Sequence, residues 1–254
     1  MRNDWFWHGD IIDAAATKCY TAQNTSRPET VAWIETFLKE DDIFYDVGAN
    51  IGAYSLMAAK YHNSNIKVYA FEPGFSNFPQ LVKNIVLNGC EESIIPLQVA
   101  LSNKTIVGTF NYSNLVSGAA LHALGEAIDE LGRPFKPILR QPVLAYRVDD
   151  LVKQFRIPVP NHIKIDVDGA ELAVLEGAAE TLTDSSVKSI IVEVAEGTEK
   201  TAHLVELLVG KGFQLLSRCE DVYGNGNGSG AKVLNYIFQR VLVSTDRAHP
   251  AMRL

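Results

Sequence analysis

Short apolar runs alternate with amphipathic segments along most of the chain. Apolar runs that end at turn residues predict buried strands at residues 43–47, 68–73 and 94–102. Apolar residues at helical spacing predict helices at residues 27–39, 55–61 and 78–88. Because strands and helices alternate, the pattern predicts an α/β fold with a mostly parallel sheet.

The second half of the chain returns to this alternation after an interruption. Residues 103–148 mix strand-like and loop-like stretches, so we expect an insert there that lines the substrate site. Two further buried strands are expected at residues 162–168 and 189–196. Residues 211–220 and 233–241 predict a terminal antiparallel pair. The Gly- and Asn-rich residues 223–230 join that pair, either as a closing loop or as an exposed connector.

Length and composition narrow the class of protein. A chain of 254 residues suits one sizeable domain, and we expect an N-terminal helical extension at 1–42 and the main domain at 43–254. A net charge of -7 and a pI near 5.4 argue against a nucleic-acid substrate. No run approaches the ~18 apolar residues of a membrane span. Three scattered cysteines predict neither a disulfide framework nor a metal knuckle, which favours the cytoplasm.

An aromatic cluster near the amino terminus, Trp5 to Trp7, is expected to dock on the domain or on a partner subunit, which leaves a homo-oligomer open.

The first candidate site follows the strand at 43–47. Gly48 and Gly52 predict a turn without side chains that would block a ligand, and the helix after it favours a carboxylate or phosphate at its amino terminus. Glu72 lies 20 residues beyond Gly52, at the end of the next strand, where it is placed to accept hydrogen bonds from ribose hydroxyls. The alternative is a purely structural turn that needs glycine only for its backbone angles.

The spacing of this turn distinguishes between two cofactors. The dinucleotide pattern needs three glycines at a fixed spacing, whereas here Asp46, Gly48, Asn50 and Gly52 alternate. An anionic Asp46 repels a pyrophosphate but attracts the ammonium group of a methionine moiety. The pattern therefore favours S-adenosylmethionine over a nicotinamide dinucleotide. We also expect the adenine near the end of the third strand, at Ala100, Leu101 and Ser102.

The second candidate site is the charged end of the strand at 162–168. Lys164 and Asp166 share one face of a strand that should be apolar on both faces, and Glu193 on the next strand could reach Lys164. We take these residues as catalytic candidates, with Asp166 as the base, although a purely structural ion pair is the alternative. Asp168 and Glu171 fit a helix capping box, and Asp168 is also a candidate substrate contact. Two carboxylates without a clear third ligand do not predict a metal site.

The insert supplies further candidate substrate contacts, although polar residues in inserts are more often only solvated. They are Asn111, Tyr112, Ser117, His122 and Arg147.

Several motifs resemble the FkbM family of S-adenosylmethionine-dependent methyltransferases. They are DVGANIG at 46–52, FEP at 71–73, VALS at 99–102, VDDL at 148–151 and KIDVDGAELAVLEGA at 164–178. The resemblance runs from about residue 28 to 241. The last motif is the most specific, and the family pattern commonly has Glu where this chain has Asp168.

The resemblance implies a Rossmann-like class I methyltransferase fold, with a seven-stranded, mostly parallel sheet and an antiparallel last strand. It also implies methyl transfer to an oxygen of a sugar, glycan or polyketide-like small molecule. The competing hypotheses are that the protein is a nicotinamide-dependent oxidoreductase or a non-catalytic S-adenosylmethionine-binding module.

Overall fold

The structure, a computed structural model, describes residues 28–129, 131–220 and 232–241 of the chain. The predictions for the aromatic cluster at Trp5 to Trp7 and for residues 223–230 lie outside these ranges. None of the helices within the described ranges is long and apolar enough to cross a membrane.

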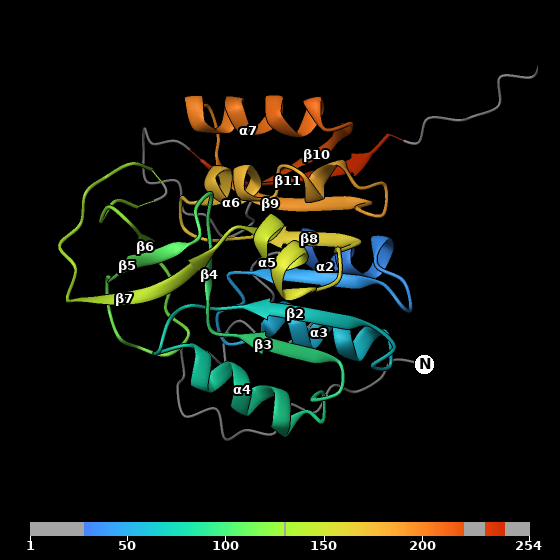
Figure 1. Ribbon diagram of the computed structural model, residues 1–254, viewed down its shortest axis with the longest axis horizontal. Helices are drawn as coiled ribbons and strands as arrows, with labels where there is room; N and C mark the ends of the chain where they lie inside the picture. Colours follow the sequence, from blue (N-terminus) through green and yellow to red (C-terminus); the bar gives the residue numbers. More distant parts are fainter. Residues whose placement is uncertain (1–27, 130, 221–231, 242–254) are drawn as a thin grey trace, which may run out of the picture.

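The main sheet has seven strands in the order β10-β11-β9-β8-β1-β2-β3 (Figure 1). Its strands are β1 (Ile43–Val47), β2 (Lys67–Phe71), β3 (Ile94–Leu97), β8 (His162–Ile165), β9 (Ser189–Ala195), β10 (Phe213–Glu220) and β11 (Val233–Arg240). The pairs from β3 through to β9 are parallel, whereas β11 runs antiparallel to both β9 and β10. The predicted mostly parallel sheet with an antiparallel last strand is confirmed.

Helices cover both faces of this sheet (Figure 1). They are α2 (Pro28–Phe37), α3 (Ala53–Tyr61), α4 (Phe78–Leu87), α5 (Val148–Phe155), α6 (Glu171–Gly177) and α7 (Glu199–Gly210), with a 3-10 turn at Thr181–Thr183. Leu151, Val174 and Leu204 from α5, α6 and α7 belong to one core cluster. Trp33 and Leu81, from α2 and α4, belong to the cluster on the opposite face.

The helix predicted near the amino terminus packs into the domain core. Trp33 of α2 is 1% exposed, and its indole Nε1 donates to Ser189 Oγ on β9 at 3.1 Å. Residues 28–37 therefore share the hydrophobic core of the main sheet, because the apolar face of α2 packs against it. The domain boundary at residue 43 remains a prediction.

The insert forms a second, four-stranded sheet in the order β4-β7-β5-β6. Its strands are β4 (Ala100–Leu101), β5 (Ile106–Tyr112), β6 (Ala123–Leu124) and β7 (Leu139–Tyr146). The prediction of one continuous strand at 94–102 is wrong, because Ala100 and Leu101 pair with Ala145 and Tyr146 of the insert instead of extending β3. A turn bond from Val99 N to Leu97 O separates the two strands.

Parallel pairing aligns the carboxyl ends of β1, β2, β8 and β9 along one edge of the main sheet. In open α/β sheets, ligands bind at this edge. The candidate residues of β1, β2, β8 and β9 therefore meet in space although they lie far apart in the sequence.

Candidate active site

The glycine turn is closed against its neighbours by backbone contacts. Gly48 has φ +79°, and a Cβ built on it would lie 1.9 Å from the backbone oxygen of Asp166. The backbone N–H groups of Gly48 and Ala49 both donate to Phe71 O at 3.0 Å. Gly52, with φ +93°, precedes the first residue of α3. A side chain at Gly48 has no room, so glycine is required here by close approach as well as by the backbone angle.

Asp46 lies at the base of this turn and has a cationic neighbour. Its carboxylate is fully buried, and Oδ2 accepts a hydrogen bond from Ser55 Oγ at 2.6 Å. The β1–β8 register places Asp46 beside Lys164, whose Nζ lies 3.6 Å from Asp46 Oδ1. The Lys164 ammonium also lies 4.9 Å from the centre of the Tyr54 ring. Lys164 therefore offsets part of the negative charge that Asp46 brings into the core.

The same ammonium reaches the second candidate carboxylate. Lys164 Nζ donates to Asp166 Oδ2 at 3.0 Å. The side chain of Asp166 is 27% exposed, compared with 4% for Lys164 and 1% for Asp46. Asp166 is thus the member of this charged group that a ligand can reach.

Glu193 lies on the same face as these charges. Lys164 is in register with Ile191, so Glu193, two positions further along β9, points to the same side of the sheet. It is 5% exposed. The ion pairs described for Lys164 are those with Asp46 and Asp166. A Lys164–Glu193 pair stays a prediction.

Glu72 is held at the end of β2 by two backbone donors. Its Oε2 accepts from Asn50 N at 2.9 Å and its Oε1 accepts from Gly74 N at 2.8 Å. Burial raises the pKa of Glu72 to about 8, and the negative charges of Asp168 and Asp46 add to the shift. The carboxyl group thus takes up a proton more readily than an ordinary glutamate, and donors from a ligand would favour its ionised form.

The predicted capping box at α6 is wrong. Asp168 has φ +53° and turns away from the helix, which begins after Ala170 with no side-chain cap. Its Oδ2 instead accepts from the backbone N–H groups of Leu121 at 2.7 Å and His122 at 3.2 Å. Glu171 Oε1 accepts from Gly169 N at 2.8 Å. The left-handed turn at 168–169 redirects Asp168 toward the insert, so this residue joins two parts of the fold.

Asn50 and Asn77 join the same stretch of the insert, residues 113–122, which we call the insert loop. Asn77 Oδ1 accepts from Gly118 N at 2.9 Å, and Asn77 Nδ2 donates to Ala119 O at 3.2 Å. Asn50 Nδ2 also donates to Ala119 O at 3.3 Å. Asn77 was missed by the sequence analysis, because its only local signal is its place just before α4. Three loops at the edge of the main sheet thus bind the insert loop.

Three of the candidate substrate contacts in the insert bond their polar atoms to other groups of the protein. Tyr112 OH accepts from Phe75 N at 3.0 Å and donates to Gln141 Oε1 at 2.7 Å. Asn111 Nδ2 donates to Gly125 O at 2.9 Å. Arg147 forms an ion pair with Asp149 through Nη2 at 2.9 Å. These contacts give Asn111, Tyr112 and Arg147 structural partners, and substrate binding by Tyr112 stays a prediction.

His122 and Ser117 differ from these residues. His122 Nδ1 accepts from Ser113 N at 3.3 Å, so the neutral ring carries its proton on Nε2. Burial lowers the pKa of His122, which favours that neutral ring. A ring of this tautomer donates through Nε2 and is a poor base. Within the described residues, His122 Nε2 and Ser117 Oγ are buried without a hydrogen-bond partner.

The residues expected around the adenine are divided between two places. Ala100 and Leu101 line a cavity of about 30 Å³ together with Gly48 and Pro73. Ser102 instead packs on α6, where a Cβ built on Gly177 would lie 2.0 Å from Ser102 O. Ala100 and Leu101 are therefore near the glycine turn, and the adenine contact stays a prediction.

The described part of the chain contains no group of three or more His, Cys, Asp or Glu side chains arranged to hold a metal ion.

Comparisons with known proteins agree with this architecture. The family model of the methyltransferase FkbM domain matches residues 46–215. The hexuronic acid methyltransferase AglP of Haloferax volcanii is 30% identical over 186 residues, covering 72% of this chain and 70% of that protein. The 31-O-demethyl-FK506 methyltransferase FkbM of Streptomyces tacrolimicus is 24% identical over 204 residues, covering 73% and 78%.

A solved structure supports the fold alone. A putative rRNA-methylase from Clostridium thermocellum superposes with a TM-score of 0.50 at 12% identity, over 85% of this chain and 97% of that one. The sheet order and the matched domain together establish a Rossmann-like class I methyltransferase fold. The chain is a methyltransferase and belongs to the FkbM family.

Proposed function

We propose that the protein transfers the methyl group of S-adenosylmethionine to an oxygen of a sugar, glycan or polyketide-like small molecule. The observation that carries this proposal is the buried Glu72 carboxyl group, bonded to the backbone of Asn50 in the glycine turn. Glu72 would accept hydrogen bonds from the ribose, in a place where ligand donors favour its charged form. The hexuronic acid named for the Haloferax volcanii relative supports a sugar acceptor.

The residues of the turn fit this cofactor. The backbone of Gly48 leaves no side chain between the turn and β8. Asp46 Oδ1 and Asn50 Oδ1 are buried acceptors without a hydrogen-bond partner in the described residues. A ligand that carries an ammonium group and hydroxyls would supply the donors that these oxygens lack. A pyrophosphate would instead face the negative charge of Asp46.

The step of the reaction that most needs a protein side chain is removal of the proton from the acceptor hydroxyl. When bound, the cofactor supplies an electrophilic methyl group on a sulfonium, so a new C–O bond forms as the C–S bond breaks. The acceptor hydroxyl must lose its proton, and Asp166 is the best-placed recipient because its side chain, 27% exposed, is more accessible than that of Asp46. Lys164, bonded to Asp166 at 3.0 Å, holds that carboxylate in place. Exclusion of water and orientation of the two reactants supply the remaining acceleration.

Calorimetric titration with S-adenosylmethionine, S-adenosylhomocysteine and NAD tests the cofactor. We expect binding of the first two and weaker binding by Glu72→Ala. Binding of NAD alone would overturn the proposal. In turnover assays, Asp166→Asn should lower kcat by about 10²- to 10⁴-fold, with the Kd for S-adenosylhomocysteine little changed. Full activity of that variant would remove Asp166 from its role as base.

A further inference from the structure

A cavity of about 530 Å³ lies between the insert and the loop that follows β8. Ile106, Val107 and Leu124 give the insert side an aliphatic surface, and Asp168 to Ala170 form part of the opposite side. The volume lies in the range of small-molecule sites. Ala170 and Leu124 also line the small cavity beside Gly48, so the large cavity begins next to the glycine turn.

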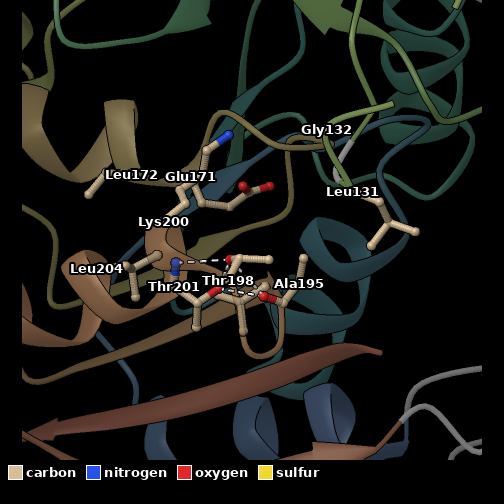
Figure 2. A pocket seen from close by; sticks show the side chains of 10 residues that line it. Leu131, Gly132, Glu171, Leu172, Ala195, Thr198, Lys200, Thr201 and Leu204 are labelled. Carbon is tan, nitrogen blue, oxygen red and sulfur yellow. Dashed lines mark hydrogen bonds between the residues drawn. The ribbon is translucent and has the colours of Figure 1, made fainter. Parts of the chain in front are cut away.

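A second cavity continues this space past Lys200. It measures about 210 Å³ and is lined by Lys200, Glu171, Thr198 and Leu131, among others (Figure 2). Lys200 belongs to the lining of both cavities. Together they could hold an acceptor longer than one sugar unit along the edge of the main sheet.

Asp168 ties the two sides of the larger cavity together. Its carboxylate accepts from Leu121 N and His122 N, and the residues that follow them, Ala123 and Leu124, line the cavity. These are charge-assisted bonds from a carboxylate to backbone donors, which are stronger than neutral ones. The position of the insert relative to the β8–α6 loop is thus set partly by Asp168.

The ionisable side chains that line this cavity are two lysines, Lys104 and Lys200, and three acids, Glu126, Asp129 and Asp168. Glu126 is exposed, and Asp168 is bonded to the insert loop. The acid Asp129 is already bonded by Arg133 through Nε at 2.7 Å and by Leu131 N at 3.0 Å. Lys104 lies on the exposed rim. The ammonium of Lys200 donates to Gly169 O at 2.8 Å, and an ammonium has three N–H donors. A ligand carboxylate would find donors and positive charge at Lys200, whereas Asp129 is paired with Arg133.

One acidic side chain near Lys200 is committed elsewhere. Glu171 lines the smaller cavity and appears beside Lys200 in Figure 2. It is 6% exposed and accepts a bond from Gly169 N, and burial raises its pKa. Glu171 thus organises the loop and is weakly able to compete as an anion for Lys200.

We propose that the 530 Å³ cavity binds the acceptor as an acidic sugar, with Lys104 and Lys200 holding its carboxylate. Asp168 is a positioning residue that fixes the insert side of this cavity. The inference rests on the proposed transfer to a sugar oxygen and adds the charge of the acceptor and its place of binding.

The test compares two probes in the presence of S-adenosylhomocysteine. Methyl glucuronide and methyl glucoside differ in one carboxylate, and their affinities are measured by calorimetry. We expect the glucuronide to bind at least about tenfold more tightly, and Lys200→Met and Lys104→Met each to reduce its affinity about tenfold or more. Lys153→Met is the matched control. Lys153 is an exposed lysine of α5 that pairs with Glu180, and it does not belong to the lining of either cavity.

Three results would overturn the inference: equal affinity for the two probes, no effect of the Lys200 and Lys104 substitutions, or an equal loss in the Lys153 control. Failure of S-adenosylhomocysteine itself to bind would instead refute the proposed function. Binding of the cofactor product without the glucuronide would refute only the assignment of the acceptor.

The positioning role of Asp168 has its own readout. Asp168→Ala removes both bonds to the insert loop, so the KM for the acidic sugar should rise about tenfold, with kcat at saturation and the Kd for S-adenosylhomocysteine little changed. Asp168→Asn keeps an acceptor oxygen and should recover most of the loss. A fall in kcat without a change in KM would show that Asp168 does not act through the position of the insert.

Discussion

The carboxyl group of Glu72 should destabilise the fold at neutral pH, and Glu72→Gln measures this effect. The pKa of Glu72 is about 8 in the folded protein against 4.5 for an ordinary glutamate. A group whose pKa rises on folding contributes stability that is present below its unfolded pKa and is lost as pH rises through its folded pKa. One pKa unit corresponds to about 1.4 kcal/mol. From about pH 5 to about pH 8, the wild type should lose about 3 kcal/mol relative to Glu72→Gln.

The substitution also has an effect that does not depend on pH. Gln offers one acceptor oxygen, whereas Glu72 accepts from both Asn50 N and Gly74 N. One buried N–H therefore loses its partner, at a constant cost of about 1–3 kcal/mol. The test is consequently the slope with pH of the difference in unfolding free energy, and not its sign at a single pH.

Urea denaturation followed by circular dichroism at about pH 5, 6.5 and 8 measures this slope. Glu176→Gln is a suitable control, because Glu176 is exposed and bonds Asn103 at the surface. If the difference between wild type and Glu72→Gln stays constant over this range, the argument from burial is refuted. If Glu72→Gln also binds S-adenosylhomocysteine as tightly as the wild type, Glu72 has no role in the cofactor site.

Three further substitutions test the pairing of Lys164 with Asp46, the close packing of the glycine turn, and the loss of stability at acid pH. Lys164→Met leaves the buried Asp46 without its ammonium and should cost about 3–5 kcal/mol of unfolding free energy in urea; a cost below about 1 kcal/mol would contradict the pairing. Gly48→Ala places a Cβ 1.9 Å from Asp166 O at a residue with φ +79°. The affinity for S-adenosylhomocysteine, measured by calorimetry, should therefore fall at least about tenfold. An unchanged Kd would refute the close-packed turn. Burial raises the pKa of Asp42, but the hydrogen bonds that it accepts outweigh burial and lower the pKa from 3.8 to about 2. The advantage of the wild type over Asp42→Asn is therefore present above about pH 4 and should disappear as pH falls to about 2, and coincident acid-unfolding curves would refute it.

Local signals in the sequence were sufficient to predict most elements of the main sheet. The strand at Ile43–Val47 is found as predicted, because an apolar run followed by glycine specifies both the strand and its end. The helix at Phe78–Leu87 ends beside Gly89, which has φ +58°, as its stop signal indicates. These features depend on neighbouring residues alone, so a single sequence carries them.

Contacts between distant residues required the tertiary structure. Asp168 resembles a helix cap in the sequence, yet it binds Leu121 N, because a left-handed turn makes a partner in the insert accessible. Ala100 and Leu101 leave the main sheet because β7 offers them a free edge. Pairing registers and turn geometries of this kind are set by the packing of whole elements, which no local pattern encodes.

The candidate site shows the same division. The sequence by itself determined which residues are candidates for the chemistry: the glycine turn and Glu72, with Lys164 and Asp166 at the end of a strand. The tertiary structure alone decided how they meet, since the β1–β8 register puts Lys164 within 3.6 Å of Asp46 and leaves Asp166 as the accessible carboxylate. Residue types are specified along the chain, whereas charge compensation and burial arise only when strands pair, because electrostatic energies depend on distance and on exclusion of water.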